Sequence, residues 1–184
     1  MREYVRLKVK EIKALNEISL KDEIVVFGSS YMSKFPFYEL VNKCHFENAI
    51  YNRSIDGLTI SEAKEIFNDC VVGLHPSKLF ISLGEEDKDN IDAIKEYKEI
   101  LNNAMKSLPN CQIYLIGLDK DSESAKTLNQ KIKGLCNSER VEYVELVWSK
   151  EVMLSIIRKQ FKQLSRFFRT KSIDFTDAFE IAYV

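Results

Sequence analysis

The chain has 184 residues, of which 45% are hydrophobic and 30% are charged. This length and composition suit one globular domain and exclude a largely disordered chain. Lysine and arginine (27) nearly balance aspartate and glutamate (28), so the overall charge favours neither nucleic acid nor an anionic membrane as a partner.

The first predicted element is an amphipathic helix over residues 3–16, part of an amino-terminal appendage that covers residues 1–22. Further along the chain, apolar runs that end in turn residues predict five strands, at residues 24–27, 48–53, 79–83, 112–118 and 141–147. Helical spacing of apolar residues predicts helices between and after them, at residues 35–41, 59–72, 90–107, 122–135 and 150–169. Thr59 and Glu62 form a capping-box pattern at the start of one of these helices.

Strands that alternate with helices predict a three-layer α/β/α fold around a parallel, flavodoxin-like sheet with strand order 2-1-3-4-5. We expect a single domain over residues 1–184, with a tail at 172–184 that could add an edge strand or pair with another subunit. The last helix carries arginine and lysine on one face, which we interpret as a solvated face, with an anionic partner as the alternative.

The remaining sequence features limit the location and the cofactors. Four widely spaced cysteines without a C-x-x-C pair predict free thiols and no metal site. The amino terminus has no signal-peptide core, and no run reaches the length of a membrane span. We therefore expect a cytoplasmic protein that has no cofactor.

Polar and glycine residues follow the first three predicted strands. Because the carboxyl ends of parallel strands meet at one edge of a sheet, these residues should line a common crevice. A serine at a strand-turn-helix junction is a nucleophile, a phosphate ligand or a helix cap. The crevice set is Gly28, Ser29, Ser30 and Tyr31 after the first strand, Asp56 and Gly57 after the second, and Gly84, Glu85, Glu86 and Asp87 after the third.

Three stretches carry a family resemblance: FGSSYMSKFP, IYNRSIDGLT and HPSKLFISLGEED. Together they resemble the SGNH, or GDSL-like, hydrolase family, whose blocks read G-D-S or G-S-S, then N-x-G-x-x-G, then G-x-N-D, then D-x-x-H. The resemblance implies the SGNH hydrolase fold and a serine-dependent esterase or acylhydrolase that acts on a small acyl or acetyl ester. It places Ser30 at the nucleophile position, Gly57 at an oxyanion-donor position and Glu86 at the position of the oxyanion asparagine.

Two departures from the family pattern predict weak or absent hydrolysis. A carboxylate at Glu86 accepts hydrogen bonds and repels an oxyanion, whereas an amide donates to it. The D-x-x-H block is missing, and no histidine follows His75. His45 and His75 each precede a strand, so roughly 17–20 Å of strand separates them from Ser30.

Several alternatives remain open from the sequence. Asp56, Glu85, Glu86 or Asp87 could act as a base only if burial raised its pKa, and Lys150 could form a Ser-Lys pair. A second subunit of a homodimer could supply a base. The crevice could instead belong to a non-catalytic module that binds a small ligand or regulates a partner. A nucleotide-binding or response-regulator module is disfavoured, because the first turn is not a glycine-rich phosphate loop and the first strand does not end in an acidic pair.

Overall fold

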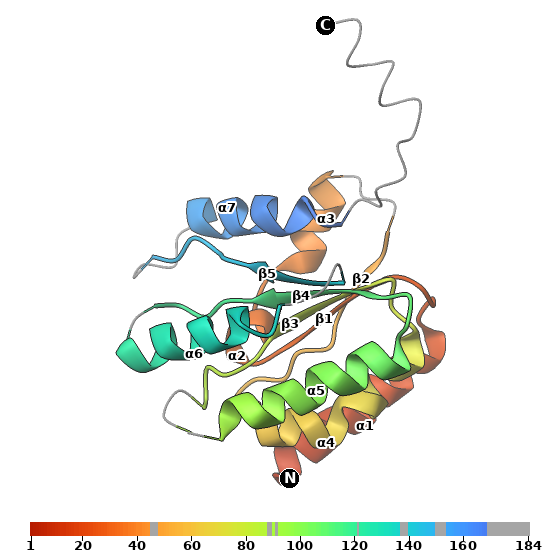
Figure 1. Cartoon of the computed structure of the whole chain (residues 1–184). Coiled ribbons are helices and arrows are strands. Elements are labelled where there is room, and N and C mark those ends of the chain that lie inside the picture. Colours follow the sequence, from red (N-terminus) through yellow and green to blue (C-terminus); the bar gives the residue numbers. More distant parts are fainter. Residues whose placement is uncertain are drawn as a thin grey trace, which may run out of the picture.

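The computed structural model describes residues 1–44, 48–87, 90, 92–120, 122–136, 140–149 and 154–168. His45, Lys150 and the tail at 172–184 lie outside the described residues. Within the described part, helices and strands alternate as the sequence predicts (Figure 1).

The sheet has five parallel strands in the order β2-β1-β3-β4-β5, which confirms the predicted topology. β1 and β3 lie side by side in the interior of the sheet. Both are buried along their whole length because helices cover both faces. The strands are β1 (Ile24–Gly28), β2 (Ile50–Asn52), β3 (Lys78–Ser82), β4 (Gln112–Ile116) and β5 (Val141–Val144).

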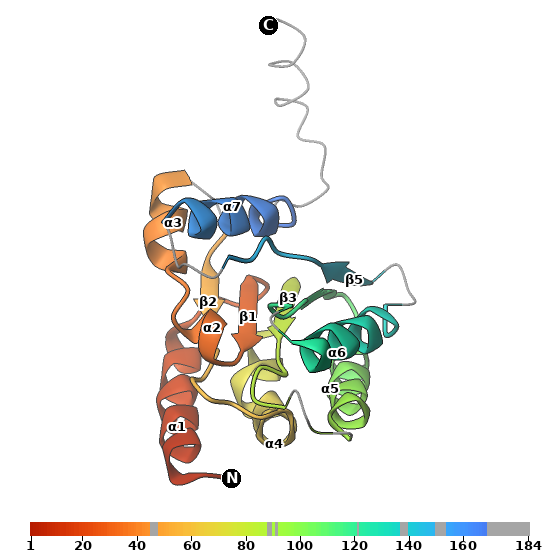
Figure 2. The same ribbon diagram turned by 90° about the vertical axis from the view of Figure 1, so that its left-hand side faces the viewer.

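Helices pack against both faces of the sheet (Figures 1 and 2). One face carries α4, α5 and α6, with α1 beside α4 in the same layer, and the other face carries α3 and α7. The helices are α1 (Glu3–Ile18), α2 (Ser30–Ser33), α3 (Phe37–Cys44), α4 (Ile60–Cys70), α5 (Ala93–Ser107), α6 (Glu123–Lys133) and α7 (Leu154–Ser165), with a short 3-10 turn η1 (Val72–Leu74).

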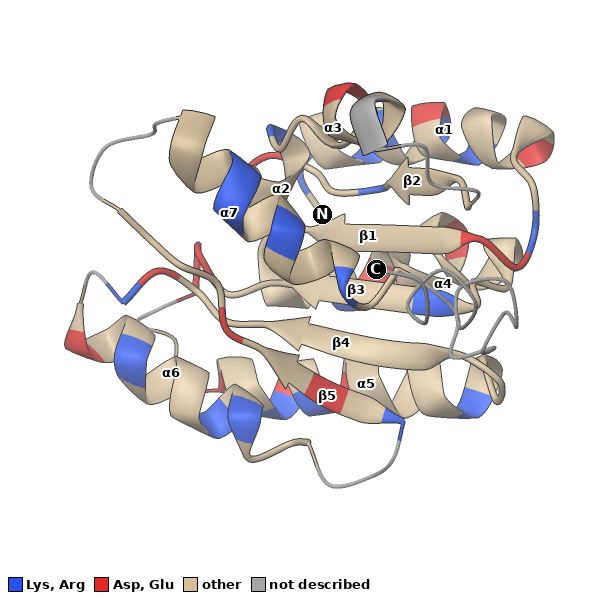
Figure 3. Ribbon diagram, turned by 90° about the horizontal axis from the view of Figure 1, so that it is seen from above, with Lys and Arg blue, Asp and Glu red and all other residues tan. Residues whose placement is uncertain are grey.

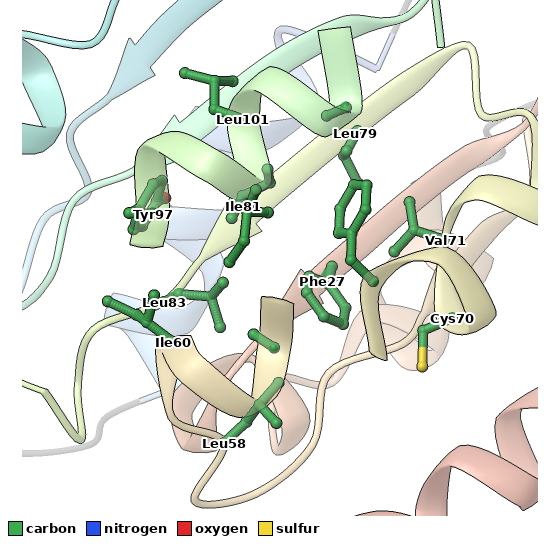
Figure 4. Close-up of a cluster of buried hydrophobic side chains, with 14 of the residues drawn as sticks. Phe27, Leu58, Ile60, Cys70, Val71, Leu79, Ile81, Leu83, Tyr97 and Leu101 are labelled. Atoms are coloured by element: carbon green, nitrogen blue, oxygen red, sulfur yellow. The ribbon is translucent and has the colours of Figure 1, made fainter. Parts of the chain in front are cut away.

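The sheet separates two hydrophobic cores, because successive side chains of a strand point to opposite faces. Leu79 and Ile81 point toward α4 and α5, where they join Phe27 (Figure 4). On the other face Phe80 stacks on Tyr114, with 4.7 Å between the ring centroids. Packing in the two cores holds the strands in place, and with them the edge of the sheet where β1, β2 and β3 end.

The outer face of α7 carries its positive charge toward solvent, as Figure 3 shows from above. Arg158, Lys159, Lys162 and Arg166 are exposed, whereas Phe161 and Leu164 are buried against the sheet. This arrangement agrees with the solvated face expected from the sequence. No described helix has the length and apolar character needed to cross a membrane.

β5 ends three residues earlier than the sequence predicts. The residues after Val144 leave the sheet, and side chains of α7 take over their backbone hydrogen bonds. The Val147 N–H donates to Gln163 Oε1 at 3.0 Å, and Gln160 Nε2 donates to the Val147 carbonyl oxygen at 2.8 Å. An apolar run such as 141–147 predicts an extended segment, but it does not say whether another strand or a side chain supplies its partners.

The predicted helix start at Thr59 is present. Thr59 Oγ1 accepts a hydrogen bond from the Glu62 N–H at 3.3 Å, and α4 begins at Ile60. The Glu62 carboxylate binds Arg2 as well. The capping box therefore also connects α4 to the amino-terminal segment.

Candidate functional site

Ser30 begins α2, two residues after β1 ends at Gly28. Gly28 pairs with Ser82 of β3, and a Cβ atom at Gly28 would lie only 2.7 Å from the Ser82 carbonyl oxygen. Glycine therefore lets the two strands approach closely at the edge where both end. This packing brings the loop after β3 next to the start of α2.

The Ser30 hydroxyl lies at the meeting point of the loops after β2 and β3. Its Oγ donates to Glu86 Oε1 at 2.9 Å and accepts from the Gly57 N–H at 2.8 Å. Ser30 is partly exposed and Glu86 is exposed, so a small molecule can reach the hydroxyl from solvent. The structure thus brings together residues from all three strand exits that the sequence selects.

Two further carboxylates lie beside Ser30. The Lys34 ammonium, 3.0 Å from Asp56 Oδ1, lowers the pKa of Asp56, and the Ser30 hydroxyl lowers it further. The Glu85 carboxylate accepts the Tyr31 N–H at 3.0 Å. The crevice therefore directs acceptor oxygens at the serine, and one backbone donor at the start of α2 already binds a carboxylate.

Arg2 holds the Gly57 loop from the outside. The Gly57 backbone is left-handed (φ +70°), which favours glycine, and its carbonyl oxygen accepts from the Arg2 guanidinium. The same guanidinium donates through Nε to Glu62 Oε1 at 3.0 Å. Arg2 lowers the pKa of the buried Glu62 to about 2. Sequence reasoning missed Arg2, because it is 55 residues from Gly57 and carries no local pattern.

Three members of the predicted crevice set are buried or closely packed. Asp87 is buried and accepts the Ile60 N–H at 2.9 Å, so it satisfies a donor at the start of α4, and burial raises its pKa. Ser29 is fully buried, and its N–H donates to the Ser82 carbonyl oxygen. Gly84 has φ +111°, and a Cβ there would meet Leu128 at 2.8 Å.

Tyr31, the residue after Ser30, pairs with an aromatic ring from a distant segment. The Tyr31 ring packs against Trp148 with 4.7 Å between centroids, and the Tyr31 hydroxyl donates to Gln160 Oε1. Burial raises the pKa of the Tyr31 hydroxyl. Trp148 belongs to the segment between β5 and α7, where the family resemblance leads one to expect the D-x-x-H block.

No imidazole among the described residues reaches Ser30. His75 is exposed and precedes β3 at the amino-terminal edge of the sheet, whereas Ser30 follows the carboxyl end of β1. The five residues of β3 span about 17 Å at roughly 3.3 Å per residue, so the two side chains lie at opposite ends of a strand. The described residues also contain no group of three or more histidine, cysteine and acidic side chains that could hold a metal ion.

Comparison with solved structures finds the same architecture in several bacterial proteins. A Streptococcus pneumoniae protein provisionally described as a platelet activating factor superposes with a TM-score of 0.78 at 20% identity, covering 91% of this chain and 94% of that one. A GDSL-like lipase from Bacteroides thetaiotaomicron gives a TM-score of 0.67 at 12% identity, covering 95% and 98%. The family 3 carbohydrate esterase of Clostridium thermocellum gives 0.64 at 12% identity, covering 85% and 98%.

The chain has the SGNH hydrolase fold. No protein-family model matches the sequence, and no curated protein does either. At these identities the likeness establishes the SGNH fold, and the chemistry has to be argued from the side chains. In this fold Ser30 follows β1, and the Glu86 carboxylate lies in the loop after β3.

Proposed function

We propose that this SGNH-fold chain uses its serine crevice to bind a small ligand and hydrolyses esters weakly or not at all. The observation that carries the proposal is the hydrogen bond from Ser30 Oγ to the Glu86 carboxylate at 2.9 Å. A serine nucleophile needs a base that takes its proton and donors that stabilise the oxyanion. Here the hydroxyl donates to a group that supplies neither function well.

The first deficiency is the base. A carboxylate with an ordinary pKa of about 4 has little tendency to take a proton from an alcohol, and histidine is the usual choice because it titrates near neutrality. Glu86 is exposed, so water competes for its carboxylate oxygens. Ser30 therefore has an acceptor at hydrogen-bond distance but no effective base among the described residues.

The second deficiency is the oxyanion hole. Acyl transfer places negative charge on the substrate oxygen, and loss of one donor already costs about 10²–10³ in rate. Glu86 would bring a negative charge to the place of a donor. Glu85 binds the Tyr31 N–H, and the Gly57 N–H binds Ser30 Oγ. The two carboxylates therefore oppose a tetrahedral intermediate, and the Gly57 N–H is the remaining donor at the serine.

The same features favour a ligand rich in hydrogen-bond donors. Asp56 and Glu86 bring acceptor oxygens to the serine, Glu85 binds the next backbone N–H, and Tyr31, the residue after the serine, packs against Trp148. Carboxylates accept hydrogen bonds from hydroxyl and ammonium groups, and aromatic faces bind cations and apolar edges. We therefore favour a neutral polyol, an amine or a small acetylated derivative of either, and we expect anions to be disfavoured.

Hydrolysis is tested with an activated acetyl ester and three proteins: the unmodified chain, Ser30→Ala and Glu86→Asn. We expect equal background rates for the first two. Glu86→Asn should restore a donor but still lack a base, so its rate should also stay near background. A rate for the unmodified chain that is far above background and falls to background in Ser30→Ala would overturn the proposal.

A second candidate function follows from the same 2.9 Å contact, since Glu86 is placed to accept the Ser30 proton. In that case the chain is a slow serine hydrolase with a Ser-Glu pair. Its turnover would fall in both Ser30→Ala and Glu86→Gln. Glu86→Asn would also lower it, because that substitution removes the same carboxylate. Glu86→Gln therefore separates this hydrolase from a binding module, in which neither substitution changes the rate.

Binding is tested by thermal unfolding with sugars, amines, acetylated sugars and inorganic phosphate. A ligand that binds only the folded chain raises the free energy of unfolding, and with it the unfolding temperature, by an amount that grows with the logarithm of its concentration above the dissociation constant. We expect stabilisation by a polyol or an amine, reduced in a variant that carries both Glu86→Ala and Asp56→Ala. Stabilisation by phosphate alone would contradict the assigned ligand class.

A further inference from the structure

Helix α1 has two apolar faces, and only one of them packs against the rest of the chain. Val5, Val9 and Ile12 are buried in the core beside α4. A second set faces solvent on the outside of the molecule, where Figures 1 and 2 show α1 next to α4. This outer stripe consists of Tyr4, Leu7, Leu15 and Ile18, which are 48%, 51%, 48% and 83% exposed.

The outer stripe is symmetric in sequence about Glu11. Leu7 and Leu15 each lie four residues from Glu11, and Tyr4 and Ile18 each lie seven residues from it. Spacings of three, four and seven residues place side chains on one face of a helix. A two-fold axis through Glu11 therefore matches this face to a second copy of itself when the two helices run antiparallel.

We propose that the outer stripe of α1 is a homodimer interface, in which two α1 helices pack antiparallel about a two-fold axis at Glu11. Tyr4 then packs against Ile18 of the partner subunit, and Leu7 packs against the partner's Leu15. The contact is isologous, as a two-fold interface requires, because each apolar residue meets the one at the mirrored position. Alternating spacings of three and four residues suit the shallow crossing angle of paired helices.

The charges at the centre of the stripe suit the same arrangement. In each copy Lys8 Nζ lies 2.7 Å from Glu11 Oε2. The axis brings two Glu11 carboxylates together, and each carries a lysine ammonium of its own subunit. The central charges therefore cancel within the dimer, whereas an unrelated apolar partner would leave one Lys8–Glu11 pair facing an uncharged surface.

The size of the stripe predicts a weak dimer. Its ends lie about 21 Å apart along the helix, at 1.5 Å per residue. Four half-exposed side chains bury roughly 400–500 Å² in each subunit, since a fully buried aromatic residue contributes about 150–250 Å². The two subunits together bury about 800–1,000 Å², which lies below the total of about 1,200–2,000 Å² for stable complexes, so we expect dissociation at micromolar concentrations.

The serine crevices would lie at opposite ends of this interface. Arg2 contacts the Gly57 loop at the amino-terminal end of α1, and the partner helix runs in the other direction. The dimer therefore leaves both crevices open. The inference is independent of the proposed ligand-binding function.

Sedimentation velocity from about 1 to 300 μM tests the interface. We expect a reversible shift from monomer to dimer, with the dissociation constant raised at least roughly 100-fold in Leu7→Glu and in Leu15→Glu, because each substitution buries an unpaired charge. The matched control is Leu154→Glu, which changes a leucine that is 57% exposed on α7 and should leave the dimer intact. A monomer at all concentrations, or a dimer that neither α1 substitution weakens, would overturn the proposal.

The antiparallel register is tested by cross-linking with a short bis-maleimide. Glu11→Cys places a thiol on the two-fold axis, so a single variant should cross-link to itself. Leu7→Cys faces the partner's Leu15, so it should cross-link poorly alone and well when mixed with Leu15→Cys. The unmodified chain measures the background from the native cysteines. Efficient self-linking of Leu7→Cys would show a parallel pair and contradict the register.

Discussion

At the scale of single residues, the proposed binding function rests on Glu86, which accepts a hydrogen bond from the Ser30 hydroxyl at 2.9 Å. The family resemblance implies an asparagine at this position, whose amide would donate a hydrogen bond to an oxyanion. The lysine at position 34 pairs with Asp56. Ser30 thus has hydrogen-bond partners in Glu86, the Gly57 N–H and Asp56, an arrangement that suits recognition of a ligand better than proton transfer.

The Arg2–Glu62 contact predicts a specific acid sensitivity. Arg2 lowers the pKa of Glu62 to about 2, from an ordinary value near 4.5. Because the folded-state pKa is depressed, the stabilisation is complete above the unfolded pKa and is lost as the pH falls from about 5 toward 2. A shift of this size corresponds to about 3 kcal/mol of unfolding free energy, at about 1.4 kcal/mol per pKa unit. Urea unfolding at pH 7, 5, 4 and 3 measures it.

The variant Glu62→Gln provides the comparison, because its amide does not titrate. It should be less stable than the unmodified chain at pH 7, and the difference between the two should shrink as the pH falls. The matched control is Glu65→Gln, on the same helix, whose carboxylate is half exposed and lies 4.0 Å from the amino terminus. Its difference from the unmodified chain should stay small at every pH. A Glu62→Gln difference that does not change with pH would contradict the assignment.

The sequence predicts the convergence of Ser30, Gly57 and Glu86, because each lies in the turn after a strand and parallel strands end at one edge. Arg2 and Gln160 could not be found in this way. Each is a long side chain on a helix or its flank, and its partner is far away in sequence. Such contacts depend on how the helices pack, which short-range patterns do not encode.

At the scale of elements, two glutamine side chains of α7 form the hydrogen bonds that a neighbouring strand would otherwise give to the backbone after β5. Gln160 is fully buried, accepts from the Tyr31 hydroxyl and donates to the Val147 carbonyl oxygen, while Gln163 binds the backbone of residues 145 and 147. These side chains attach α7 to the end of β5 and to the aromatic wall of the crevice. The periodicity of α7 predicts its apolar stripe, but a buried glutamine inside that stripe gives no sign of its partners.

Replacement of Gln160 by leucine should cost about 1–3 kcal/mol of unfolding free energy, because it removes the hydrogen-bond partner of the partly buried Tyr31 hydroxyl and of the Val147 carbonyl group, at about 0.5–1.5 kcal/mol for each bond. Gln163→Leu, at a partly exposed position of the same helix, should cost less than about 1 kcal/mol. Urea unfolding measures both. In a double-mutant cycle, Tyr31→Phe should recover part of the loss in Gln160→Leu, because it removes the orphaned hydroxyl. Equal losses for the two glutamines would contradict this role.

At the scale of the whole molecule, the fold class is predictable because one signal repeats along the chain. Five apolar runs alternate with amphipathic helices, and a parallel sheet with helices on both faces is the arrangement that buries all of them. The ends of elements are less predictable, as β5 shows. The two cores meet only through the sheet, so its central strands couple the stability of both layers.

This coupling predicts an order of amide hydrogen exchange. β1 and β3 are buried along their full length and have a strand on each side, whereas β2 is a three-residue edge strand. Amides of Val25–Phe27 and Leu79–Ile81 should therefore exchange only through global unfolding, with the same free energy as urea denaturation. Amides of β2 should exchange through smaller openings. Native-state exchange followed by NMR at increasing urea measures both classes, and the Glu62→Gln variant should lower the protection of β1 and β3 by the amount it lowers global stability. If β2 proved as protected as β3, the edge would open only together with the centre, and the proposed difference between the strands would be wrong.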